Sequence, residues 1–136
     1  MNGSVTVRSV KGGTRLTFSS VTDDAFIATF EGPDFSGNVN VSTYHSGFPN
    51  SLFDELAAEW CGWKGEKKWS SLEGELHLTA KSDKLGHVFL SVTVGVINGR
   101  DDWRLHGDLL IEAGQLDGLA KSLNGLFSAA RFQIDT

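Results

Sequence analysis

The chain has 136 residues, of which 40% are hydrophobic and 21% are charged, and its formal net charge at pH 7 is −5. This length and composition predict one globular domain, residues 1–136, that is long enough to bury a hydrophobic core. The closest approach to a basic cluster is Lys64, Lys67 and Lys68, so the acidic balance argues against general nucleic-acid binding, which depends on clustered Lys and Arg.

The N-terminal third of the chain predicts four short strands. Apolar and polar residues alternate in each segment, as in a sheet with one buried face. The turn Lys11-Gly12-Gly13-Thr14 is typical of a hairpin, and Gly32-Pro33-Asp34 breaks the third segment. We expect an antiparallel meander. The four segments are 4–10, 15–20, 25–32 and 36–44.

A first helix follows from Ser51. Ser51 and Asp54 resemble a capping box, with Asp in place of the usual Glu or Gln. Gly62 is the expected C-terminal end of this helix. Apolar residues recur at helical spacing, which assigns the last of them, Trp60, to the core. The stripe is Leu52, Phe53, Leu56, Ala57 and Trp60.

Three more strands and a second helix complete the chain. The strand segments are 71–82, 87–97 and 102–112, joined by turns at Asp83-Lys84-Leu85-Gly86 and Asn98-Gly99. The helix is expected from Gln115 to Phe127, where Leu116, Leu119, Ala120, Leu123 and Phe127 form an apolar stripe. The order of four strands, helix, three strands and helix predicts an α+β fold. We expect one curved antiparallel sheet of about seven strands with both helices packed on one face.

Three sequence features predict a cytoplasmic protein that does not associate with a membrane. Its one cysteine, Cys61, cannot form an intrachain disulfide, which is typical of a reducing compartment. The first residues have neither a basic start nor an apolar stretch, as a secretory signal would. No apolar run approaches the roughly 20 residues of a membrane span.

Three of the four tryptophans lie within ten positions, at Trp60, Trp63 and Trp69. Trp63 and Trp69 flank the lysine-rich loop 64–68, where exposed indole rings could stack on a ligand or anchor a partner. Alternatively they tuck beneath the loop, since Gly62 and Gly65 permit the tight turns this requires. The pattern favours the structural interpretation but leaves both open.

The polar side of the last three strands is the second candidate site. Histidine and carboxylate side chains on one sheet face could hold a metal or perform acid–base chemistry. A one-sided sheet nevertheless has a polar face in any case, and its cross-strand pairs stabilise it. No metal-ligand spacing, nucleophile motif or phosphate-binding loop is present, so we assign no catalytic residue, metal or cofactor. The candidate binding residues are Glu73, Glu75, His77, Arg104, His106 and Asp108, with Ser91 on the same side.

The second half of the chain resembles a known protein family. Its motifs are W-x-x-L-E-G-E-L-x-L from Trp69, D-x-x-G-H-V from Asp83, Trp103, and E-A-G-Q-L from Glu112. The chain is similar over roughly Phe53 to Phe127 to a family of small bacterial proteins of unknown function, which implies no activity, cofactor or site residue. It is also loosely similar in size and charge to immunity proteins that neutralise bacterial toxins, which implies inhibition by binding.

These observations favour a non-enzymatic protein-binding module, with toxin neutralisation as one form of it. A basic toxin is the partner expected from the acidic balance, with Trp63 and Trp69 as anchors beside the acidic groups of the sheet face. A domain that binds a small ligand or a metal and catalyses a reaction on that face is the first alternative. A structural subunit of an oligomer is the second, and both a monomer and a homodimer remain open.

Overall fold

The computed structural model describes residues 3–83, 85–97 and 99–134, with side chains as far as Ser128. Eight strands and two α-helices make up the described chain, so the α+β class is confirmed. None of the described helices is long and apolar enough to cross a membrane. The elements are β1 (Ser4–Arg8), β2 (Arg15–Ser19), β3 (Ala25–Glu31), β4 (Ser36–Ser42), α1 (Asn50–Ala58), β5 (Lys67–Ser70), β6 (Leu76–Ser82), β7 (His87–Val96), β8 (Trp103–Glu112), the 3₁₀ turn η1 (Ala113–Gln115) and α2 (Leu116–Ile134).

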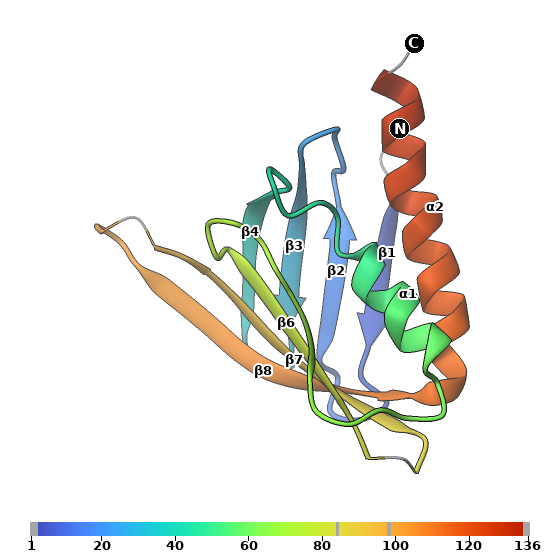
Figure 1. The fold of residues 1–136 in the computed structure, drawn as a ribbon. Coiled ribbons are helices and arrows are strands. Elements are labelled where there is room, and N and C mark those ends of the chain that lie inside the picture. The colour runs from blue at the N-terminus through green and yellow to red at the C-terminus, as the bar shows by residue number, and fades with distance from the viewer. Residues whose placement is uncertain (1–2, 84, 98, 135–136) are drawn as a thin grey trace.

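The strands form two antiparallel sheets, so the prediction of one seven-stranded sheet is wrong. The first sheet has the order β1-β2-β3-β4 and the second has the order β5-β6-β7-β8. In Figure 1 the second sheet crosses obliquely in front of the first, while both helices lie toward the β1 side. Helix α1 separates β4 from β5 along the chain, and the strands that follow it pair only with one another. Strand β5 was not predicted.

The core lies where the inner faces of both sheets meet the helices. Its centre is aromatic: the Phe18 ring lies 5.7 Å from that of Phe26, 6.4 Å from Phe53 and 6.0 Å from Phe127 between centroids. Trp69 of β5 joins it at 6.3 Å from Phe26. These residues therefore join β2, β3, α1, α2 and β5, and burying each large side chain contributes about 1.5–3 kcal/mol.

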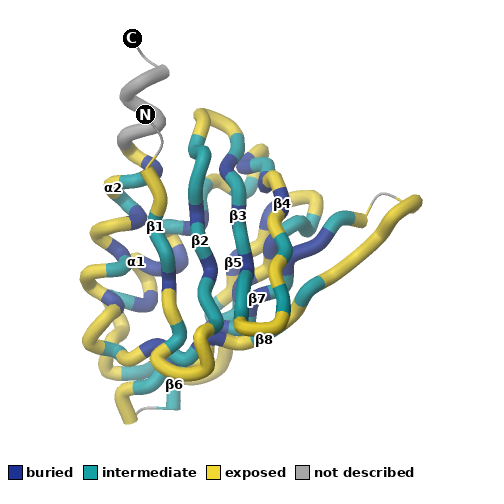
Figure 2. The backbone as a smooth tube through the Cα atoms, turned by 180° about the vertical axis from the view of Figure 1, so that it is seen from behind, coloured by how far each residue is buried: buried dark blue, intermediate teal, exposed yellow. Residues whose placement is uncertain are grey.

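The two sheets contact each other at two of their edges. At one side the backbone N–H of Val10 donates to the Leu110 carbonyl at 2.9 Å, and Leu110 N–H donates to Ser9 Oγ at 3.0 Å. At the other side the β7–β8 hairpin projects past the edge strand β4 (Figures 1 and 2). There Trp103 and Leu105 pack closely against Gly37 of β4, where an added Cβ would lie 3.1 Å from Leu105 and 3.3 Å from Trp103 side-chain atoms.

The helix ends differ in part from the prediction. Helix α1 follows Pro49 without a side-chain cap, so the Ser51–Asp54 box is wrong, and Asp54 instead accepts a hydrogen bond from Asn124 at 2.8 Å. The helix ends at Ala58, before the predicted stop at Gly62. The start of the second helix is confirmed by the Glu112–Gln115 capping box, although α2 continues beyond Phe127 to Ile134. The predicted turns include Lys84 and Asn98, which lie outside the described residues.

Gly95 is a position where the β7–β8 pair tolerates no side chain. An added Cβ would lie 2.4 Å from the Trp103 carbonyl oxygen and 3.2 Å from Arg104 Cα. Because backbone must move, we expect Gly95→Ala to lower the free energy of unfolding by about 1–3 kcal/mol. Urea unfolding measures this, with Gly125→Ala on α2 as the control.

The control substitution adds a Cβ that meets nothing within 4 Å. It should raise the free energy of unfolding by about 0.5–1 kcal/mol through the lower entropy of the unfolded chain. Two variants of equal stability would contradict the close approach of β7 and β8.

Candidate functional site

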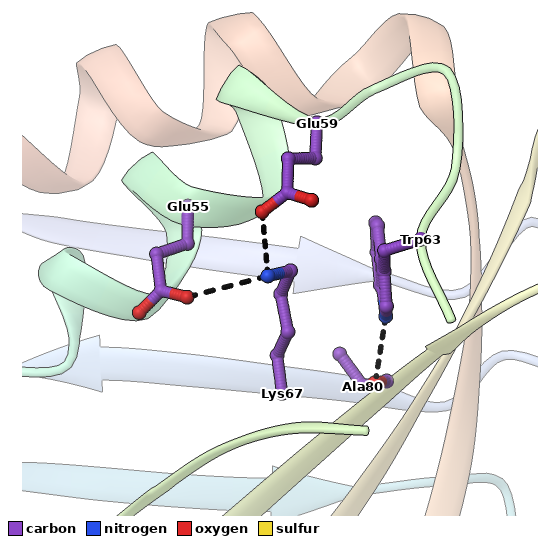
Figure 3. A network of polar contacts seen from close by, with 5 residues as sticks. All are labelled: Glu55, Glu59, Trp63, Lys67 and Ala80. Atoms are coloured by element: carbon purple, nitrogen blue, oxygen red, sulfur yellow. Dashed lines mark hydrogen bonds and ion pairs between the residues drawn. The ribbon is translucent and has the colours of Figure 1, made fainter. Parts of the chain in front are cut away.

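The tryptophan-rich segment is a structural corner between α1 and the second sheet. Trp63 is 7% exposed and donates its indole N–H to the Ala80 carbonyl of β6 at 3.3 Å, as Figure 3 shows. Trp69 is 8% exposed within β5. The interpretation of these two rings as exposed anchors is therefore wrong. The assignment of Trp60 to the core is also wrong, since Trp60 is 62% exposed.

Lys67 ties the corner to the first helix. Its ammonium lies 2.6 Å from Glu59 Oε2 and 3.5 Å from Glu55 Oε2, and 5.8 Å from the centroid of the Trp63 ring (Figure 3). The hydrogen bond to Glu59 raises the pKa of Lys67 above its ordinary value, with Glu55 adding to the effect. Lys67, one of the lysines that suggested a ligand-binding loop, therefore forms intramolecular ion pairs.

The buried indole N–H groups of Trp63 and Trp69 differ in hydrogen bonding, so the same substitution can be compared at both positions. No acceptor among the described residues bonds the buried Nε1 of Trp69, whereas Trp63 Nε1 donates to Ala80. Substitution by Phe removes similar volume from both sites, but only Trp63→Phe removes a hydrogen bond. We expect Trp63→Phe to lower the free energy of unfolding by about 1 kcal/mol more than Trp69→Phe. Equal losses in urea unfolding would contradict this difference.

The outer face of the second sheet carries four of the predicted binding residues. His77, Arg104, His106 and Asp108 are all exposed and occupy outward positions on β6 and β8. Glu73 and Glu75 are not within the strand as predicted, because β6 begins only at Leu76. Both lie in the β5–β6 turn, where Glu75 accepts a hydrogen bond from Ser71 Oγ at 2.7 Å.

Polar groups on this face are arranged in cross-strand pairs between β7 and β8. Ser91 Oγ donates to Asp108 Oδ1 at 2.8 Å, and Thr93 Oγ1 lies 2.7 Å from His106 Nδ1. Thr93 also pairs with His77 in the β6–β7 register, so the two histidines are two strands apart. Within the described residues, no group of three or more His, Cys, Asp or Glu side chains could hold a metal ion.

An apolar patch interrupts this polar face near the β6–β7 turn. Phe89 of β7, which is 43% exposed, lies directly opposite the outward Leu110 of β8. Val10, also 43% exposed, is bonded through its backbone to Leu110. The sequence contained the signal, because Phe89 alternates onto the same side as Ser91 and Thr93. We call Phe89, Leu110 and Val10 the apolar patch.

Charged side chains flank the apolar patch. Lys81 pairs with Phe89 across the β6–β7 ladder and forms an ion pair with Glu66 at 3.3 Å. Glu66 also contacts Lys68 of β5 at 3.5 Å. The hydrogen bond from Lys81 lowers the pKa of Glu66, and Lys68 acts in the same direction. The apolar patch therefore has a charged border formed by Lys81, Glu66 and Lys68.

Several residues of the recognised motifs stabilise the fold. Asp83 Oδ1 accepts hydrogen bonds from the backbone N–H of Leu85 at 2.7 Å and of His87 at 3.1 Å, and Asp83 Oδ2 contacts His87 Nδ1 at 2.7 Å. Gly74 and Gly86 have φ values of +79° and +92°, which favour glycine. These motif residues therefore hold the turns before β6 and β7, and Glu112 and Gln115 cap the start of the last helical segment.

The Asp83 bonds predict a pH-dependent contribution to stability. Partial desolvation would by itself raise the pKa of Asp83, but the bonds from Leu85 and His87 together lower it. A lowered pKa in the folded state stabilises the protein above the ordinary Asp value of about 3.9, and this stabilisation is lost as pH falls through the folded value. We expect the wild type to have a higher Tm than Asp83→Asn at pH 7.

Circular dichroism melts of both proteins between pH 7 and pH 2 test this prediction. The difference in Tm should shrink as pH falls below the ordinary Asp range, because the wild-type carboxyl group then becomes protonated. A difference that stays constant down to pH 2 would show that the Asp83 charge does not stabilise the turn.

Comparison with known proteins identifies the family of the chain. No curated protein and no solved structure matches it. A family model does match, over residues 7–130. This range contains all eight strands except the start of β1, and it also contains α1 and most of α2. The chain belongs to the family of unknown function DUF6228.

Proposed function

We propose that the protein is a non-enzymatic module that binds another protein through the outer face of β5–β8. The observation that carries the proposal is the apolar patch: Phe89 is 43% exposed on the outer face of β7, and Val10, a loop residue bonded through its backbone to Leu110 of β8, is also 43% exposed. Exposed apolar groups with a polar rim are typical of protein–protein contacts. Large aromatic side chains near the centre of such a surface commonly provide much of the binding energy.

The polar pairs suit this role because they hold their side chains in place before a partner arrives. Asp108 is oriented by Ser91, and His106 by Thr93. Less side-chain freedom is then lost on association, which favours affinity. Arg104, Lys68 and Lys81 add exposed positive charge, whereas Glu66 and Asp108 add negative charge, so the partner surface should be of mixed charge. Neutralisation of a toxin is the specific form suggested by the likeness to immunity proteins.

The proposal is tested by affinity capture from host lysate with matched surface variants. Phe89→Asp places a charge in the apolar patch, whereas Tyr44→Asp places the same charge on a 67% exposed aromatic residue in the β4–α1 loop. We expect one stoichiometric partner with wild type and Tyr44→Asp, and at least about a tenfold lower affinity with Phe89→Asp. Equal capture by both variants, or no partner with any bait, would contradict the proposal.

A further inference from the structure

A separate hollow lies between the C-terminal end of α1 and the beginning of α2. Its volume is about 320 Å³, and it is lined by Ala57, Trp60, Ala113, Gly114 and Asp117. This volume lies at the lower end of the range for small-molecule sites. The hollow shares no residue with the apolar patch or with the polar pairs of the second sheet, so it is considered independently of the proposed function.

Trp60 provides the aromatic wall of the hollow. Helix α1 ends at Ala58, so the helical spacing that predicted a buried position no longer applies at Trp60. The side chain is 62% exposed, whereas Trp63 and Trp69 of the same corner are 7% and 8% exposed. The face of an indole ring carries partial negative charge and attracts cations more strongly than other aromatic rings do.

Asp117 provides the charged wall. It lies in the first turn of α2, and its Oδ2 forms an ion pair with the Lys121 ammonium at 3.0 Å. Both side chains of this pair are about three-quarters exposed, at 77% and 76%. Such exposed pairs are weak, so a second cation can share or displace Lys121. The carboxylate is thus already placed to accept an ammonium or guanidinium group.

The floor consists of small residues. Ala57, Ala113 and Gly114 have no polar side-chain atoms, and a Cβ added at Gly114 would meet nothing within 4 Å. A sugar would find few side-chain partners for its several hydroxyl groups, and Asp117 is the charged residue among those that line the hollow. An organic cation can instead stack on the indole ring of Trp60 and pair its charge with the Asp117 carboxylate.

We propose that this hollow binds an organic cation bearing a guanidinium or ammonium group. Trp60 contacts the cation through its ring face, Asp117 neutralises its charge, and Gly114 leaves space for it. A free small molecule and a Lys or Arg side chain of a polypeptide share this chemistry.

The test is a titration with N-acetyl-arginine methylamide, followed through the Trp60 indole N–H resonance, which Trp60→Phe assigns. The citrulline analogue has nearly the same shape without the charge. We expect saturable binding of the arginine probe and at least about tenfold weaker binding of the citrulline probe. Asp117→Asn should weaken arginine binding, and Phe89→Asp should leave it unchanged.

A pair of glycine variants on one helical segment provides the steric control. Gly114→Leu fills the hollow, while Gly118→Leu adds the same side chain outside it, and neither Cβ meets an atom within 4 Å. We expect arginine binding to be lost in Gly114→Leu and kept in Gly118→Leu, with both proteins folded by circular dichroism. Equal binding by the two variants, or equal affinity for arginine and citrulline, would overturn the proposal.

Two further probes distinguish the sources of the cation. If an arginine-containing pentapeptide binds more tightly than the capped residue, the natural ligand is the side chain of a polypeptide. If choline binds more tightly than both, the ligand is a free small cation. Absence of any shift of the Trp60 resonance with all three probes would contradict a cation site.

Discussion

The fold depends on one aromatic cluster where both sheets and both helices meet. Phe18 and Phe26 project from the first sheet toward Phe53 of α1, Phe127 of α2 and Trp69 of β5. The two sheets contact each other directly mainly through β4 and β3 with β7 and through β1 with β8. The helices therefore fill the side that the crossed sheets leave open, and their stripes are apolar for that reason. The Lys67 and Trp63 contacts of the corner then hold α1 against the second sheet.

The local elements could be predicted from the sequence, but their assembly could not. Alternation of residues located seven of the eight strands, and helical spacing located both helices. Strand β5 was not predicted because two of its four residues are lysines, and one of them, Lys67, forms ion pairs with Glu55 of α1 and with Glu59 just after it. Alternation shows which residues share a face but not which strands pair, so two sheets were taken for one. Trp60 was misplaced because spacing was continued past the last helical residue, Ala58.

The candidate sites show the same division between local and long-range information. His77, His106 and Asp108 were correctly placed on an outer sheet face, because that depends only on the period of two along each strand. The hollow beside Trp60 depends on α1 and α2 lying together, and their contact includes the Asn124–Asp54 hydrogen bond across 70 positions. No local pattern predicts such a contact. The hydroxyl partners of Asp108 and His106 likewise follow from strand register, which the sequence alone left undetermined.

The arrangement of the two sheets has a consequence for how the chain folds. Each sheet is a meander of consecutive strands, so its ladders close short loops and can form early. The Ser9–Leu110 bond instead joins residues 101 positions apart and requires β8 to be in place. The first meander is therefore complete in the nascent chain well before its partner sheet emerges from the ribosome. Until then its inner phenylalanines lack the cover that the second half of the chain provides in the folded protein, and exposed apolar surface of this kind promotes aggregation.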